Sequence, residues 1–363
     1  MLALRPLSVI FLAIVAAAAA SYQSSTKESS AVTDPMELVT GATQAAVTPQ
    51  ERSAALALLD RASQNSNLYA PGTPPFTLKV SFDSSGDSLY TGAGEMEETQ
   101  ISHARGRWTA RIGDFSQIRI YDHGRAFDEK TAAGMPLRLQ MVRGAILWPV
   151  HVNSTRMAIR TASATWKGKA VTCVLLSGPG SAPTSTPGRR WEETESCIDP
   201  ASNLMLVHSE APGIYAAYDF TDALHFHGRT LARQISISEG NRTVLQVRIA
   251  SVEDAATADD SLFIPTEQML AQGPAAFMAG PFRFSQFTHA PAGEDGVLQP
   301  VVVHASIDDH GKVLEAEVLQ ESDPALAQTA LSLVRQSEYG SQAEDRRPTQ
   351  REAFISVRFV TQQ

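Results

Sequence analysis

The chain has 363 residues, of which 43% are hydrophobic and 19% charged, and its 30 basic and 39 acidic residues give a net charge of −9 at pH 7. This composition is typical of a globular protein that is long enough for two domains. The acidic balance excludes a broad nucleic-acid-binding surface, which would need clustered lysine and arginine.

The first twenty residues have the pattern of an export signal. A single charge, Arg5, precedes an uncharged run at 7–20, and small residues at 18 and 20 favour cleavage after Ala20. The run is short for a membrane-spanning helix, which needs about 20 apolar residues. An uncleaved N-terminal anchor is the alternative. Residues 21–33 are mostly polar or charged, and we expect a disordered leader there.

The two cysteines, Cys173 and Cys197, are 24 residues apart. An oxidising compartment after export favours a disulfide between them. Strand-like runs at 170–176 and 203–207 flank a Gly- and Pro-rich loop at 178–188, so we predict a structural disulfide across neighbouring strands beneath this loop. A redox-active pair would favour Cys-x-x-Cys spacing, and two cysteines alone make a poor metal site.

Two helix-start patterns precede the first strand. Residues 34–37 read Asp-Pro-Met-Glu and predict a short helix that ends near Ala46. Thr48 and Glu51 form a capping box around a proline at the first helical position, which predicts a helix over 49–64.

From residue 76 to residue 249 apolar and polar residues alternate, which is the period of strands with one covered face. A short apolar helix is predicted between Pro136 and Pro149. The fold class is therefore predicted as α+β, with residues 34–255 forming one curved, half-barrel-like antiparallel sheet that has helices on its inner face. Strands are predicted at 76–82, 108–112, 117–121, 157–159, 170–176, 203–208, 214–218, 234–237 and 244–249.

The order of an N-terminal helix, short strands, a Pro-flanked helix and a late strand pair resembles the LolA-, LolB- and RseB-like envelope proteins over roughly residues 35–255. This resemblance implies a half-barrel partly closed by helices over an apolar cavity for acyl chains, and hence a lipid-like or lipoprotein ligand. A generic antiparallel domain with a filled core is the alternative. Residues 256–295, which glycine and proline punctuate, are predicted as a linker with a short helix near 266–271.

Residues 296–363 predict a separate ββαβ module. Two strands at 301–307 and 312–319 are joined by a turn in which Gly311 can take a positive φ. A helix begins at Pro324 with Asp323 as its cap, and a last strand covers 353–359.

Three features of this module are similar to the TonB C-terminal domain over about residues 296–361: Gly311-Lys312-Val313, Ser322 before the helix, and an Ala-rich helix at 327–334. Tyr339 stands where the family has an aromatic residue, whereas the Pro-Ala and Gly-x-Pro segment that follows is degraded here. The resemblance implies that the edge of the last strand accepts an extended segment of an outer-membrane or periplasmic protein by strand addition. Phe354, Ser356 and Arg358 are the predicted partner-binding residues near this edge. A solvated or closed edge is the alternative.

The sequence lacks His-Glu-x-x-His, Gly-x-Ser-x-Gly and P-loop patterns. His225 and His227, and the turn 308–310, contain metal-ligating residue types, but surface histidines and an ordinary turn are favoured. We therefore predict no catalytic residue, metal or cofactor.

The predicted function is that of a non-catalytic periplasmic envelope protein, which binds a lipid-like or lipoprotein ligand with its β domain and an envelope protein with its TonB-like module. The alternative is a TonB-family energy transducer, anchored in the inner membrane by its N-terminal segment. A hydrolase within the β domain ranks third, and no oligomeric state is assigned.

Overall fold

The structure is a computed structural model. It describes residues 38–86, 88–132, 135–149, 158–178, 185, 187–190, 193–275, 282–289, 300–320, 323–339, 343–344, 347–348 and 350–360. The predicted export signal, the predicted leader and Ser322 lie outside these residues.

A 13-stranded antiparallel sheet forms the first domain, in the order β1-β7-β8-β9-β10-β11-β14-β15-β2-β3-β4-β5-β6. The predicted alternation holds in β2, where every second residue from Phe76 to Ser84 is buried. A separate hairpin is formed by β12 (Leu224–Phe226) and β13 (Arg229–Leu231). The large sheet consists of β1 (Gln44–Ala45), β2 (Phe76–Ser84), β3 (Gly92–Ser102), β4 (Arg105–Ile112), β5 (Phe115–Asp122), β6 (Arg125–Lys130), β7 (Ala158–Trp166), β8 (Lys169–Ser177), β9 (Thr194–Asp199), β10 (Leu204–Ala211), β11 (Ile214–Asp219), β14 (Gln234–Glu239) and β15 (Arg242–Asp254).

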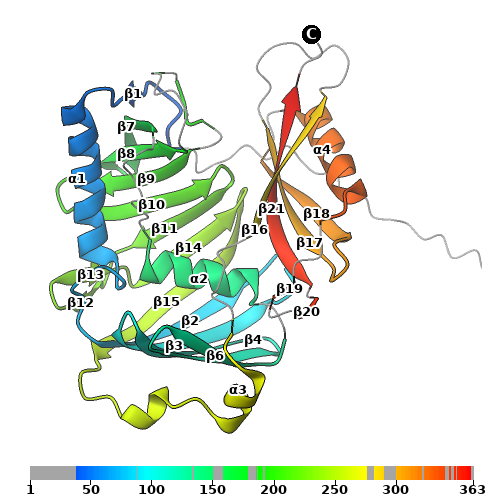
Figure 1. The fold of residues 1–363 in the computed structure, drawn as a ribbon. Coiled ribbons are helices and arrows are strands. Elements are labelled where there is room, and N and C mark those ends of the chain that lie inside the picture. Colours follow the sequence, from blue (N-terminus) through cyan, green and yellow to red (C-terminus); the bar gives the residue numbers. More distant parts are fainter. Residues whose placement is uncertain are drawn as a thin grey trace, which may run out of the picture. The chain divides into compact units, whose positions relative to one another are not determined.

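Two helices lie within the curve of this sheet (Figure 1). The first, α1 (Pro49–Ser66), begins at the predicted capping box: Thr48 Oγ1 accepts from the Glu51 N–H at 3.2 Å, and the Glu51 carboxylate accepts from the Thr48 N–H at 3.0 Å. The second, α2 (Leu137–Leu147), follows Pro136 as predicted. Buried residues of both helices and of the strands form one apolar core. The predicted fold class, a curved antiparallel sheet with helices on its inner face, is confirmed.

The short helix predicted to end near Ala46 is wrong for its described part, residues 38–46. None of these residues is helical, and β1 pairs Gln44 with Thr161 and Ala45 with Arg160 of β7. Val39 is buried in an apolar cluster with residues of β8 and β10. Tertiary pairing therefore outweighs the local helix-start pattern.

The segment predicted as a linker, 256–295, contains regular structure. A short 3₁₀ helix, η1 (Asp260–Phe263), precedes the predicted helix α3 (Glu267–Gln272), which Thr266 caps. A strand that the sequence did not predict, β16 (Phe282–His289), follows. This strand pairs with the C-terminal sheet, so the linker prediction is corrected at residues 282–289.

The C-terminal module is a four-stranded mixed sheet in the order β16-β21-β17-β18, with one helix packed on it. Asp323 Oδ1 caps the helix by accepting from the Ala325 N–H at 2.6 Å. Gly311 has a φ of +93°, and a Cβ at this position would collide with the carbonyl of Tyr339. The elements are β17 (Val301–Ile307), β18 (Val313–Gln320), α4 (Pro324–Gln336) and β21 (Arg351–Val360), together with a small hairpin of β19 (Ala343–Glu344) and β20 (Arg347–Pro348).

The helices among the described residues are too short or too polar to cross a membrane.

Candidate functional site

The last strand of the module, β21, is an inner strand of the sheet. On one side it pairs with β17 in antiparallel register, from Val301 opposite Val357 to Ile307 opposite Arg351. On the other side it pairs with β16 in parallel register, residue for residue, so that 282–289 lies opposite 353–360 without a shift. The β16 segment therefore occupies the position at which an added strand would lie.

This pairing corrects the prediction that Phe354, Ser356 and Arg358 lie near a free edge. Their neighbours along β21 alternate with them and are buried in the apolar core beneath α4, so the three predicted residues lie on the opposite face of the sheet. Phe354 is buried there and belongs, with Val302 and Leu319, to the apolar core of the first domain. Ser356 and Arg358 are half-buried.

A buried chain of alternating charges crosses from the first domain to the module. Arg138 of α2 donates two hydrogen bonds to Glu239 of β14, one of them at 3.1 Å. His304 of β17 lies 3.2 Å from Glu239 through Nδ1 and 3.1 Å from Glu352 through Nε2. Glu352 of β21 also accepts from Ser88 at 3.1 Å. All four charged side chains are nearly inaccessible to solvent, and each has an oppositely charged neighbour.

Within this series of buried charges, the pKa of His304 is raised and the pKa of Glu239 is lowered. Burial alone would lower the pKa of His304, but the carboxylates of Glu239 and Glu352 outweigh it and raise this pKa to about 9. Burial alone would raise the pKa of Glu239, but His304 and Arg138 outweigh it and lower this pKa to about 2. At neutral pH the imidazole is therefore charged and donates from both nitrogens.

These shifts predict how stability depends on pH. The contribution of His304 is complete below pH 6.5 and is lost as pH rises through about 9, whereas that of Glu239 is complete above pH 4.5 and is lost as pH falls toward about 2. We expect the His304 contribution to the free energy of unfolding, on the order of 3 kcal/mol, to disappear on the alkaline side. Urea unfolding of the wild type and of His304→Gln at about pH 6 and about pH 9 measures it. Parallel pH profiles of the two proteins would contradict the assignment.

One apolar pocket on the inner face of the first domain is nearly filled by side chains. The apolar pocket between the helices and the sheet, lined by Ala145, Met205 and Leu231 among others, has a volume of about 10 Å³, which is room for about one water molecule. Nearby, the Arg143 guanidinium lies over the rings of Trp108 and Trp148, at 4.7 Å and 5.4 Å from their centroids. This described pocket therefore has no space for the acyl chain that the LolA-like resemblance implies.

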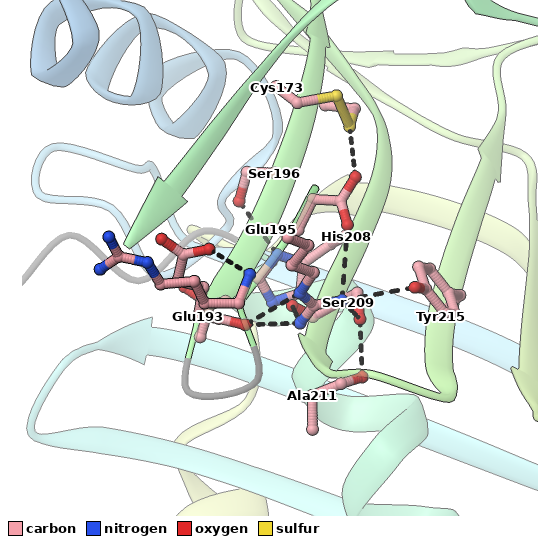
Figure 2. A network of polar contacts seen from close by, with 12 residues as sticks. Cys173, Glu193, Glu195, Ser196, His208, Ser209, Ala211 and Tyr215 are labelled. Carbon is pink, nitrogen blue, oxygen red and sulfur yellow. Dashed lines mark hydrogen bonds and ion pairs between the residues drawn. A yellow bond between two sulfur atoms is a disulfide. The ribbon is translucent and has the colours of Figure 1, made fainter. Parts of the chain in front are cut away.

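The predicted disulfide between Cys173 and Cys197 is present and joins directly paired residues of β8 and β9. The strand that carries Cys197 is β9, whereas the sequence indicated the run that became β10. Figure 2 shows Glu195, whose carboxylate lies 3.1 Å from Cys197 Sγ, between the disulfide and Ser209. Neither cysteine is free, so neither offers a thiolate to a metal or a substrate in this state.

Two arginines, Arg160 and Arg189, make buried contacts with residues in and near β9 and β10. Arg189 donates to Ser209 Oγ at 2.6 Å and lies 3.4 Å from Glu195, and both side chains of this ion pair are buried. Arg160 donates twice to Glu193, at 2.6 Å each. These contacts fix the described residues Arg189 and Glu193 to neighbouring strands.

The residues that the sequence offered as metal ligands lie on β12, in the turn after it and in the turn before β18. His227 lies in the turn after β12, 3.1 Å from Asp254, while His225 is exposed on β12. Asp308 Oδ1 accepts from the N–H groups of His310 and Lys312, at 2.9 Å and 2.8 Å, as a turn residue does. The sequence analysis did not predict the buried ion pairs of Arg138, Glu239, His304 and Glu352. Their partners are distant in the sequence, and no sequence motif indicates these pairs.

Comparison with known proteins identifies the C-terminal module. Residues 292–361 match the family model of the Gram-negative bacterial TonB protein C-terminal domain. This confirms the resemblance inferred from the turn, the capped helix and the last strand. The chain beyond the module lies outside this match, and a comparison with curated proteins gave no match.

Two solved structures are similar to the first domain. A LolA superfamily protein from Nitrosomonas europaea is 9% identical, with a TM-score of 0.39, over 58% of this chain and 97% of that one. A domain assigned as an outer membrane lipoprotein-sorting protein from Vibrio parahaemolyticus is 6% identical, with a TM-score of 0.36, over the same shares of the two chains. Both TM-scores lie below 0.5.

Proposed function

We propose that this chain is a non-catalytic protein of the bacterial cell envelope whose C-terminal module binds an extended segment of another envelope protein. The match to the TonB C-terminal family supports the compartment, and the export pattern at 1–20 agrees with it. The observation that carries the proposal is the parallel pairing of β16 with β21, because it shows that this side of β21 forms a full ladder with an extended segment.

The first domain serves as the scaffold of the module in this proposal. One face of the module sheet packs beneath α4, and the other contributes Val302, Leu319 and Phe354 to the core of the first domain. The buried charges of Glu239 and His304 add a specific polar link. Because both faces of the module sheet are packed, a partner can bind this sheet only at its edges.

Photo-crosslinking in intact cells tests this proposal. A photoreactive residue at Ser337, which accepts a 3.1 Å hydrogen bond from Gln286 of β16, would report whatever occupies that side of β21. We expect intermolecular adducts that map to an extended, proline-free segment of an envelope protein. A photoreactive residue at Leu314, 51% exposed on the opposite edge strand, is the matched control. Equal adducts from both positions, or none from Ser337, would refute the proposal.

N-terminal sequencing of the protein from the same cells separates the proposal from the energy transducer. We expect the mature chain to begin at Ser21, after removal of the export signal. Retention of the Met1 segment would favour the transducer, which needs a membrane anchor.

A further inference from the structure

We propose that β16 is an internal competitor, which covers the binding edge of β21 until an extended segment of the partner replaces it. This inference rests on the proposed function, since it concerns the regulation of the same edge. It begins from the eight consecutive parallel pairs between 282–289 and 353–360, which leave no part of that stretch of β21 open to another strand.

The opposite edge of the sheet, formed by β18, is less suited than β21 to accept the partner segment. The strand there, β18, departs twice from regular register against β17, between Val302 and Val303 and between Ser306 and Ile307. Bulges of this kind bend a strand and discourage further pairing, and the exposed Glu315 adds a charge to the edge. Among the described edges β18 is therefore the less favourable acceptor, and a strand that pairs directly with β21 must take the place of β16.

The described contacts of β16 are of a kind that another segment can reproduce. Among the described elements, β21 is the one with which it makes extensive contact. Gln286 Nε2 donates a hydrogen bond to Ser337 Oγ at 3.1 Å, Thr288 is half-buried and His289 is exposed. Main-chain hydrogen bonds depend little on sequence, and a parallel ladder is slightly less stable per residue than an antiparallel one.

The geometry also defines the partner's chemistry. The segment must run parallel to β21 and contain about eight residues without proline, because each proline removes an N–H from the ladder. The β16 sequence meets this condition, since its eight residues lack proline while Pro281 precedes them directly. A synthetic peptide with the β16 sequence is therefore a suitable probe.

Fluorescence anisotropy of this labelled peptide, titrated with the mature full-length chain, tests the inference. In the wild type the tethered β16 competes at a high effective concentration, so we expect weak binding. The double variant Gln286→Pro with Phe287→Pro removes a ladder hydrogen bond whichever of the two adjacent N–H groups points toward β21. We expect it to bind the peptide at least about tenfold more tightly than the wild type. The same peptide carrying both prolines should not bind.

The two single proline variants are matched controls for each other. One of them removes an N–H that pairs with β21 and the other removes an N–H that points away, so only one should increase peptide binding. If near-UV circular dichroism shows the double variant to be unfolded, the single variants decide. Equal peptide affinity of the wild type and a folded double variant would overturn the inference.

The outcome is distinguishable from a failure of the proposed function. Tighter peptide binding by the variant, without any Ser337 adduct in cells, would support the internal competitor and refute the partner. Adducts from Ser337 without any gain in peptide binding would support the partner and refute the internal competitor.

Discussion

Replacing Glu239 with glutamine should destabilise the protein by about 3–5 kcal/mol, the range for a buried ion pair that loses one partner. Glu239 is the shared acceptor of Arg138 and His304, and its side chain is 1% exposed. Its removal leaves the Arg138 charge, on a side chain with no solvent exposure, without the carboxylate that it faces. Urea unfolding near neutral pH measures the loss.

The control is an ion pair of similar length at the surface. Glu95 lies 2.9 Å from Arg111, and both side chains are more than 60% exposed. Solvent screens such a pair, so Glu95→Gln should change the unfolding free energy by less than about 1 kcal/mol. A second variant, Arg138→Met with Glu239→Met, removes both charges and should be less destabilised than Glu239→Gln alone. Equal decreases in the free energy of unfolding for Glu239→Gln and Glu95→Gln would show that the buried ion pairs of Glu239 stabilise the protein no more than a surface ion pair.

The strands that the sequence predicts are those in which apolar residues face the core. In β2 the alternation of Phe76, Leu78, Val80 and Phe82 with polar residues is complete, and these four residues are buried. Local chemistry was equally readable at the capping box of α1 and at the Asp323 cap of α4. These signals act within a few residues of each other, and a single sequence therefore contains them.

Among the strands that escaped prediction, β3 and β9 contain charged residues that face inward. In β3, Glu98 is fully buried and binds Arg143 of α2 at 2.8 Å. In β9, Glu195 is fully buried beside Arg189. An inward glutamate interrupts the apolar period, and the arginine that makes its burial acceptable lies elsewhere in the sequence.

The sequence predicted the strand β21 of the candidate site, but it did not predict that β16 pairs with this strand. The family resemblance located β21 as the strand with a binding edge, and the family match agrees over residues 292–361. The occupant of that edge, β16, pairs with residues about seventy positions later in the chain. Its residues show no strict alternation, and glycines and prolines lie on both sides, so composition alone indicated a linker.

Loss of the Cys173–Cys197 disulfide should lower the free energy of unfolding by about 3.5 kcal/mol in the chain-entropy model. The separation of 24 residues sets this value, because the link restricts the unfolded chain. The folded state should change little, since Arg160 binds Glu193 and Arg189 binds Ser209 through contacts that do not involve sulfur. Urea unfolding of Cys173→Ala with Cys197→Ala, compared with the oxidised wild type, measures the loss.

Reduction of the wild type is the matched control for the alanine pair, because it breaks the link without removing the sulfur atoms. A free Cys197 thiol could donate to the Glu195 carboxylate, which lies 3.1 Å from the sulfur, whereas alanine leaves that oxygen without this contact and creates a small cavity. The reduced protein should therefore be less destabilised than the alanine variant. A loss of less than about 1 kcal/mol in both proteins would contradict the entropic account. If the segment between the cysteines becomes sensitive to protease under native conditions, the disulfide acts on the folded state instead.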